Sequence, residues 1–200
     1  MRLIIIRHGE TIQNVAGICQ GQGPGELSEN GVEQAKKLGL RFKDEKIDVI
    51  YSSDLQRAID TANEILKYHS SLNLKLDKRL RERSFGSFEG KLRPDIDWGK
   101  PPKDVETEEE MISRGKSFID EMYKQYKDKT VVAVSHGGMK RAFYTIMHNI
   151  PVHKHCSWDK IKNTSVSEFE FQEDGNHKIK LLNCTNHLDD DVTDSYSDRM

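Results

Sequence analysis

The strongest constraint on the fold is an apolar run near the amino end that stops abruptly at Arg7-His8-Gly9. Residues 3–6 read Leu-Ile-Ile-Ile, a composition typical of a strand buried on both faces of a sheet. Glu10 and Thr11 are expected to form the first turn of a helix directly after it. Because ligands bind at the carboxyl ends of strands in open α/β sheets, a cation, an imidazole and a glycine backbone there indicate an anion site. Taken alone, Arg-His-Gly fits an ordinary surface strand end about equally well.

A second segment repeats this design later in the chain. Residues 130–134 form another apolar run, and Ser135-His136-Gly137 follows before a helix that is expected to reach about Asn149. Two such units would place two imidazoles at one edge of the sheet, beside the free backbone N–H groups of a helix start. The shared context favours this interpretation over two unrelated surface histidines.

A third predicted strand, residues 47–51, ends in the polar stretch of residues 52–54, which we expect to cap a helix running to about Tyr68. Arg57 falls in the first turn of that helix, where a cation opposes the helix dipole. This position makes more sense if Arg57 faces a bound anion, with a plain surface arginine as the alternative.

The remaining pattern completes an α/β chain. Ser28 and Thr107 are expected to be helix N-caps, and Val32 is predicted on the buried face of the helix after Ser28. Residues 20–25 form a glycine-rich loop of the kind that closes over an anion site, although a plain connector is favoured for most of its residues. Residues 80–90 mix charge, aromatic residues and glycine without a regular period, and such loops carry function more often than core. The other expected elements are helices over 29–42 and 108–126, a strand over 74–77, and a hairpin over 165–171 and 178–184 that turns at 174–176.

Composition limits the organisation of the chain and its partners. The chain has 200 residues, of which 35% are hydrophobic, enough for one α/β domain, predicted over 1–188 and followed by a flexible acidic tail at 189–200. The formal net charge of −2 provides no basic footprint for nucleic acid. The chain starts directly with the buried strand and shows no signal peptide or membrane-spanning run. We therefore expect a cytoplasmic protein that binds no membrane.

The cysteine and histidine spacing does not support a metal site. The three cysteines are odd in number and show no CxxC spacing, which supports neither a disulfide framework nor a zinc site. His148, His153, His155 and Cys156 lie near one another, but their spacing fits no common metal site. We therefore expect no metal ion and no other cofactor.

The residues predicted at the carboxyl edge of the sheet share one kind of chemistry. An arginine fork binds phosphate oxygens bidentately, and a neutral imidazole can attack phosphorus through its free lone pair. A second imidazole can donate to the equatorial oxygens, and a carboxylic acid can protonate the departing oxygen. The set therefore points to phosphoryl transfer in which cationic side chains replace a metal. Its members are Arg7, His8, Asn14, Arg57, Glu82 and His136.

In the order of its motifs the chain resembles the histidine phosphatase superfamily, in the phosphoglycerate mutase-like family. The resemblance implies a three-layer α/β/α sandwich with a mostly parallel central sheet, and a phosphohistidine intermediate. The matching motifs span nearly the whole chain and include Arg7-His8-Gly9-Glu10-Thr11, Gln20-Gly21, Ser53-Asp54-Leu55 with Arg57, Glu82 with Gly86, and Ser135-His136-Gly137.

The same resemblance implies a role for each site residue. His8 would be the nucleophile, and Glu82 would donate a proton to the leaving group and then act as a base toward water. The phosphoryl group would be held by Arg7, Arg57 and His136, with help from Asn14 and the backbone of Gly137, and the substrate would be contacted by Gln20 and Gly21 of a mobile loop.

Two departures from the family pattern favour a phosphatase over a phosphoglycerate mutase. The segment Lys91–Thr107 is shorter than the insertion of mutases, and Gln13 stands where mutases usually carry tryptophan. Arg83, directly after Glu82, is a mutase-like feature, although sugar-bisphosphate phosphatases share the Leu-Arg-Glu-Arg stretch. We predict a phosphatase of small-molecule phosphomonoesters, with sugar phosphates or bisphosphates as candidate substrates. A phosphoglycerate mutase is the alternative function, followed by a non-catalytic phosphate-binding module. A homodimer is a candidate oligomeric state.

Overall fold

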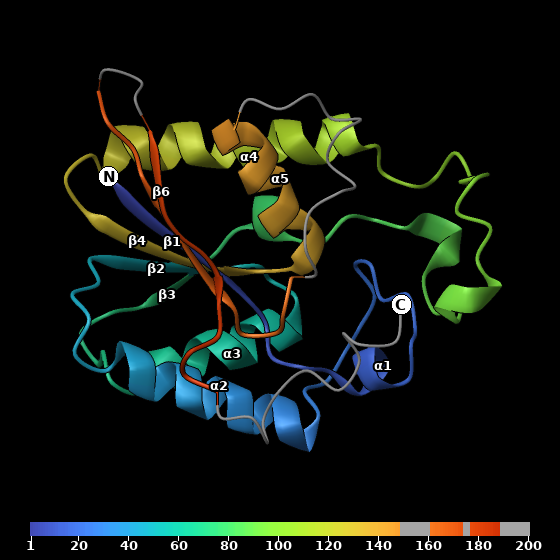
Figure 1. The fold of residues 1–200 in the computed structure, drawn as a ribbon, viewed down its shortest axis with the longest axis horizontal. Helices are drawn as coiled ribbons and strands as arrows, with labels where there is room; N and C mark the ends of the chain where they lie inside the picture. Colours follow the sequence, from blue (N-terminus) through green and yellow to red (C-terminus); the bar gives the residue numbers. More distant parts are fainter. Residues whose placement is uncertain (149–160, 174–176, 189–200) are drawn as a thin grey trace.

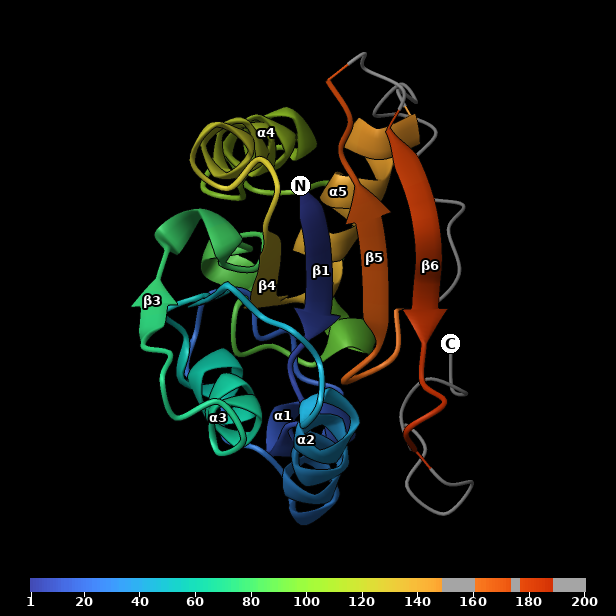
Figure 2. The same ribbon diagram turned by 90° about the vertical axis from the view of Figure 1, so that its left-hand side faces the viewer.

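A six-stranded sheet runs through the centre of the protein. The computed structural model describes residues 1–148, 161–173 and 177–188. The strands are β1 (Arg2–Arg7), β2 (Val49–Ser52), β3 (Leu74–Leu76), β4 (Thr130–Ser135), β5 (Val166–Glu170) and β6 (Lys178–Cys184). Their order is β3-β2-β4-β1-β5-β6, and Figure 2 shows β3 and β6 at the two edges. Only the pairings of β5 with β1 and with β6 are antiparallel, so the sheet is mostly parallel, as predicted.

Helices cover both faces of this sheet. α2 (Glu29–Phe42) and α3 (Gln56–Leu66) lie on one face, and α4 (Glu108–Gln125) and α5 (Gly137–His148) lie on the other (Figure 1). The expected three-layer α/β/α sandwich is therefore confirmed. The short helix α1 (Ile12–Val15) follows β1, and three 3-10 turns lie at Lys78–Leu80, Gly86–Phe88 and Arg93–Asp95.

The register of the parallel strands brings the three predicted polar segments to one edge. Arg7 at the end of β1 lies opposite Ser135 at the end of β4, and Ser52 at the end of β2 lies opposite Val134. The residues that follow these strands therefore leave the sheet side by side. Figure 1 shows α1 and the irregular green segment after β3 at this same end.

The core lies in two layers, one on each side of the sheet. Ile4 and Ile6 of β1 pack toward α2 and α3, whereas Leu3 and Ile5 pack toward α4 and α5. All four side chains are buried, because successive strand residues point to opposite faces and both faces are covered. The apolar run that opens the chain is thus a central strand, as its composition predicts.

Three local predictions were wrong. Val32 is 37% exposed, and the buried face of α2 instead includes Gln34, whose side-chain oxygen accepts from the Glu10 backbone N–H at 2.9 Å. The N-cap of α3 is Leu55, with no side-chain cap, rather than the polar stretch before it. Glu10 does not open α1, because Thr11 is the N-cap of that helix.

Several predictions concern residues 149–160, 174–176 and 189–200, which lie outside the described parts of the chain. They are the histidine and cysteine cluster with His153, His155 and Cys156, the hairpin turn, and the acidic tail. Within the described residues, every helix is too short or too polar to cross a bilayer.

Candidate active site

Two buried histidine rings meet at the carboxyl edge of the sheet. His8 follows β1 and His136 follows β4, and their ring centroids are 5.0 Å apart with the ring planes tilted by 57°. The parallel pairing of β1 with β4 sets this separation, since each histidine leaves the sheet one residue after its strand ends. Sequence periodicity alone could place the two rings at one edge, but not at contact distance.

The His8 ring is fixed in one tautomer by its neighbour in sequence. His8 Nδ1 lies 2.7 Å from the carbonyl oxygen of Gly9, and because a carbonyl can only accept, Nδ1 must carry the proton. Nε2 is therefore left with a free lone pair. Burial lowers the pKa of His8 well below its usual value, and the charges of Arg57 and Arg7 lower it further. At neutral pH the ring is uncharged, and its free lone pair lies on a defined nitrogen, the state that a nucleophilic imidazole requires.

The backbone around His8 is held from three other segments. Thr61 Oγ1 accepts from the Gly9 N–H at 3.0 Å, and the Asn163 side-chain amide donates to the His8 carbonyl at 3.0 Å. A Cβ on Gly9 would lie 2.6 Å from the carbonyl oxygen of Gly31, so only glycine allows α2 to approach this closely. The backbone of His8 is thus held rigidly in place.

The His136 ring has hydrogen-bonding capacity that the described residues do not use. Both ring nitrogens are buried, and neither has a hydrogen-bond partner among the residues that the structure describes. Burial lowers the pKa of His136 well below its usual value, followed by the charge of Arg57. A buried polar atom without a partner costs about 1–3 kcal/mol, which favours a role in ligand binding.

Arg57 is buried at the start of α3 and points into the loop of residues 20–25. Its guanidinium donates to the carbonyl oxygens of Gly21 at 2.7 Å and Gly23 at 3.0 Å. Burial lowers the pKa of Arg57 to about 10, and the Glu82 carboxylate opposes that effect, so the side chain is charged at neutral pH. Arg57 is therefore not a plain surface arginine, and its orientation toward a bound anion stays a prediction.

Arg7 and Glu82 converge on the start of α5. Arg7 donates to the carbonyl of Ile161, and its Nε would lie 3.7 Å from a Cβ placed on Gly137. Glu82 Oε2 accepts from the Gly138 N–H at 3.0 Å, and Glu82 Oε1 accepts from the N–H of the next residue in the chain at 2.8 Å. A Cβ on Gly138 would lie 2.1 Å from Glu82 Oε1, so this glycine leaves room for the carboxylate. A carboxyl group thus stands at the start of α5, the helix that directly follows His136.

The remaining predicted contacts come from the loop of residues 20–25. The Gln20 side-chain oxygen accepts from Asn14 Nδ2 at 3.1 Å and from Thr11 Oγ1 at 2.9 Å. Gly21 contributes its carbonyl oxygen to Arg57. The structure therefore brings Asn14, Gln20 and Gly21 to the same edge, where Asn14 bonds Gln20 and Gly21 bonds Arg57.

A carboxylate fastens this loop to the irregular segment after β3. Glu89 Oε1 accepts from the backbone N–H groups of Gln22 and Phe85, each at 2.9 Å. Cys19 adds two backbone hydrogen bonds, to Gly90 and Lys91, and packs with Phe88 and Ile96 in a small apolar cluster. These contacts thus join the two loops to each other.

Two residues that hold the site were not among those predicted from the sequence. Arg114 of α4 holds the backbone around Glu82, and Asn163 holds the carbonyl of His8. Arg114 did leave a signal, because it falls beside the apolar stripe of α4 formed by Met111, Gly115 and Phe118. Asn163 left none, since it lies in an irregular stretch before β5.

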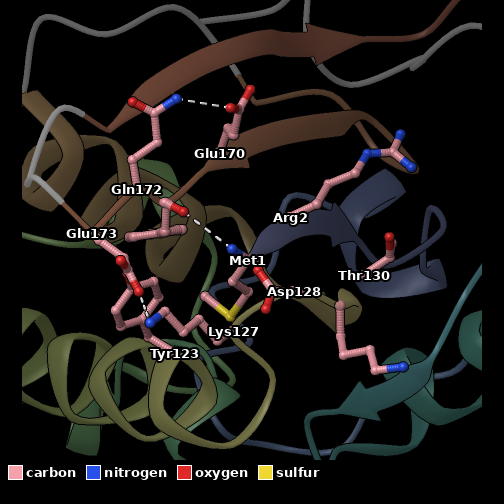
Figure 3. Close-up of a pocket in the computed structure, with 11 residues that line it drawn as sticks. Met1, Arg2, Tyr123, Lys127, Asp128, Thr130, Glu170, Gln172 and Glu173 are labelled. Carbon is pink, nitrogen blue, oxygen red and sulfur yellow. Dashed lines mark hydrogen bonds and ion pairs between the residues drawn. The ribbon is translucent and has the colours of Figure 1, made fainter.

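A cavity of about 590 Å³ lies at the opposite, amino-terminal edge of the sheet (Figure 3). It is lined by Met1, Arg2, Thr130 and Glu170 among others, and Lys127 forms an ion pair with Glu173 at its side. None of the predicted site residues lines it. In the described ranges, no three His, Cys, Asp or Glu side chains gather as a potential metal site.

Comparison with known proteins gives consistent matches over the whole site. The family model described as "Histidine phosphatase superfamily (branch 1)" matches residues 3–185. Phosphoserine phosphatase 1 of Hydrogenobacter thermophilus is 34% identical over 94% of each chain. Glucosyl-3-phosphoglycerate phosphatase of Mycobacterium tuberculosis is 31% identical over 76% of this chain and 77% of that one. The solved structure of Bacillus stearothermophilus YhfR superposes with a TM-score of 0.87 at 26% identity, over 93% of this chain and 98% of that one.

Proposed function

This chain belongs to the histidine phosphatase superfamily, and from that membership we propose how the residues at the carboxyl edge of the sheet carry out its reaction. The protein is a phosphatase of this superfamily, a hydrolase of phosphorylated small molecules. The observation that carries the mechanism is the hydrogen bond from His8 Nδ1 to the Gly9 carbonyl. It leaves a neutral Nε2 with its lone pair available.

In the first step, His8 Nε2 attacks the phosphorus atom of a phosphomonoester. The bond from phosphorus to the ester oxygen breaks, and Glu82 gives its proton to that oxygen, so that an alcohol leaves. In the second step, water attacks the phosphohistidine and Glu82 takes a proton from the water. Inorganic phosphate leaves, and His8 and Glu82 return to their starting states.

The charge of the transferred phosphoryl group is balanced by two guanidiniums and a helix end. Arg7 and Arg57 supply positive charge, and the backbone N–H of Gly137 at the start of α5 supplies a donor. His136 adds a ring nitrogen that has no partner among the described residues. Donors placed before the reaction stabilise the transition state because little reorganisation is needed.

Hydrolysis is favoured over transfer to a second hydroxyl by the contacts of Arg83. In a mutase, a free cation near the acid would hold the carboxylate of the substrate. Here Arg83 Nε donates to the Glu106 carbonyl at 2.7 Å, and its guanidinium lies 3.7 Å from the Glu108 carboxylate. Arg83, the mutase-like residue of the sequence, is thus bound by Glu108 of α4 and by Glu106 of the segment before it.

We further propose a small alkyl phosphomonoester as the substrate, with sugar phosphates or bisphosphates as the first candidates. Two relatives are named for a phosphorylated amino acid and a phosphorylated glucosylglycerate, both phosphates of small alcohols. We also propose a cytoplasmic location. The free thiols of Cys19 and Cys184 fit the reducing conditions expected there. Small phosphate esters, rather than nucleic acid or membranes, are the proposed partners.

Trapping the covalent intermediate tests this proposal. Wild-type protein is mixed briefly with a radiolabelled phosphoester and quenched in alkali, and acid-labile label should remain on the protein. His8→Asn should carry no label because it lacks the attacking Nε2. His69→Asn, a histidine near the end of α3 that bonds the Phe42 carbonyl, serves as the matched control and should be labelled normally. Label that persists in His8→Asn would refute the assignment of the nucleophile.

A further inference from the structure

Arg114 of α4 uses its whole guanidinium to hold the loop that carries Glu82. The side chain is only 17% exposed, and all five of its N–H groups are engaged. Three hydrogen bonds go to backbone carbonyls, those of Arg79 and Arg81 at 2.7 Å and that of Glu82 at 2.9 Å. The other two go to the Glu106 carboxylate at 2.6 and 3.0 Å.

These side-chain hydrogen bonds take the place of the backbone hydrogen bonds that a helix or strand would give to residues 79–82. Ser135 Oγ donates to the Leu80 carbonyl at 2.7 Å, so four consecutive carbonyls, residues 79–82, each accept from a side chain. Gln22 also reaches the Glu82 carbonyl, at 3.1 Å, but Arg114 bonds three of the four carbonyls with one group. An irregular backbone with this many bonds to one rigid group takes its position from that group.

Glu106 extends the same support to the residue after the acidic segment. Its Oε2 accepts from Arg114 and also from the Ser84 backbone N–H at 2.9 Å. The Glu106 backbone N–H also donates a hydrogen bond of 2.9 Å to the Ser84 carbonyl. The pair of Arg114 and Glu106 therefore fixes the chain on both sides of Glu82.

The position of the Glu82 carboxylate depends on the position of its backbone. Glu82 Oε2 accepts from the Gly138 N–H at 3.0 Å, and a shift of the backbone would break this bond at the start of α5. A shift of about 1 Å in a reacting group can cost about a hundredfold in rate. The hydrogen bonds of Arg114 go to backbone carbonyls and to Glu106, so its contacts reach the site through the backbone of Glu82. Its charge also helps to lower the pKa of His136, an effect that Arg114→Lys retains.

We propose that Arg114 is a positioning residue for the general acid, acting through the carbonyls of residues 79, 81 and 82. The inference rests on the proposed role of Glu82. The distinguishing consequence is a dependence on the leaving group. A misplaced acid slows the loss of an alkoxide, which needs a proton, but hardly slows the loss of p-nitrophenolate, a far weaker base.

The test measures single-turnover phosphorylation of His8 by an alkyl phosphate and by p-nitrophenyl phosphate. Arg114→Met should lose about ten- to a hundredfold with the alkyl phosphate, and no more than about threefold with p-nitrophenyl phosphate. Arg114→Lys keeps the charge but not the planar fork, and should show the same selectivity to a smaller degree. It also keeps the test intact if the methionine variant folds poorly.

Arg2→Met is the matched control for the loss of a paired guanidinium. Arg2 forms a two-bond pair with Glu168 at the far end of β1, so its removal should lower stability without changing the ratio of the two rates. The double variant Arg114→Met/Glu82→Gln should be no slower with the alkyl phosphate than Glu82→Gln alone. Additive losses in that double variant would overturn the inference.

The proposed acid and the proposed positioning residue can fail separately. If Glu82→Gln is selective for the leaving group but Arg114→Met slows both substrates equally, Glu82 keeps its role and the inference about Arg114 is wrong. If Glu82→Gln itself slows both substrates equally, the acid role falls and the inference falls with it.

Discussion

The Arg57 guanidinium donates to the Gly21 carbonyl at 2.7 Å, so the loop of residues 20–25 is held by a cation that we assign to the phosphoryl group. A phosphate oxygen is a stronger acceptor than a neutral carbonyl, because the charge on the acceptor strengthens the bond. Loop and phosphate therefore compete for the same N–H groups. The position of residues 20–25 should accordingly influence the affinity for phosphate.

Loosening this loop at Gly21 should strengthen the binding of inorganic phosphate. Gly21→Ala puts a Cβ 2.1 Å from Glu89 Oε1 at a φ of +53°, which pushes the loop off Glu89. Releasing one hydrogen bond of Arg57, about 1 kcal/mol net, corresponds to about a fivefold lower inhibition constant for phosphate. The measurement is competitive inhibition of p-nitrophenyl phosphate turnover.

Gly90→Ala is the control for the cost of a positive φ. Gly90 has a φ of +86°, but nothing lies within 4 Å of its Cβ. Both variants should lose about 1–2 kcal/mol of stability from the left-handed backbone. Only Gly21→Ala should bind phosphate more tightly, and equal inhibition constants in the two variants would rule out competition between loop and phosphate.

Replacing Glu82 with glutamine should separate substrates by their leaving group. In Glu82→Gln the new amide oxygen can still accept from the Gly138 N–H, but the side chain has no proton to release to an alkoxide. Turnover of alkyl phosphates should fall about a hundred- to ten-thousandfold, while phosphorylation by p-nitrophenyl phosphate is spared. Because the same carboxylate activates water, phosphoenzyme should accumulate with p-nitrophenyl phosphate. A variant that accumulates no phosphoenzyme would show that another group serves the water step.

Water should take the phosphoryl group in preference to a second hydroxyl. With 3-phosphoglycerate and a bisphosphoglycerate primer, inorganic phosphate should appear faster than the isomerised phosphoglycerate. The reason is that Arg83 already bonds the Glu106 carbonyl and lies near the Glu108 carboxylate, so its guanidinium is not free to bind a substrate carboxylate. Isomerisation that outpaces phosphate release would establish the mutase alternative.

Stability should fall in mild acid, partly through His187. Its Nδ1 accepts from Arg41 at 3.1 Å and its Nε2 donates to Thr164 Oγ1 at 3.1 Å, and burial lowers its pKa to about 4. Between about pH 6.5, where the unfolded chain takes up the proton, and pH 4, the folded protein resists protonation. Stability is therefore full above pH 6.5 and is lost as the pH falls toward 4.

Chemical denaturation across this pH range measures the effect. One such histidine contributes a slope of up to about 1.4 kcal/mol per pH unit. His187→Asn should reduce the slope by part of that amount, while His8 and His136, whose pKa values are also lowered, maintain the rest. An unchanged slope in His187→Asn would contradict the assignment.

The sequence by itself determined the features that depend on local order. The aliphatic run before Arg7 and the one before Ser135 specify central strands, because only a chain covered on both faces carries such runs. Ser28 and Thr107 specify helix starts through their own side chains, and the structure keeps both caps. Two histidines after two parallel strands then fall at one edge.

Tertiary structure alone decided the contacts that join distant segments. Glu10 precedes α1, yet its carboxylate accepts from Ser28 at the start of α2. Arg57 reaches a carbonyl 36 residues away, and Arg114 reaches the carbonyl of Glu82 from 32 residues away. Periodicity shows which face of a helix is apolar, but the hydrogen-bond partners of a buried polar group depend on which backbone the packing brings beside it. The partner of each cation at the site is for that reason a property of the fold.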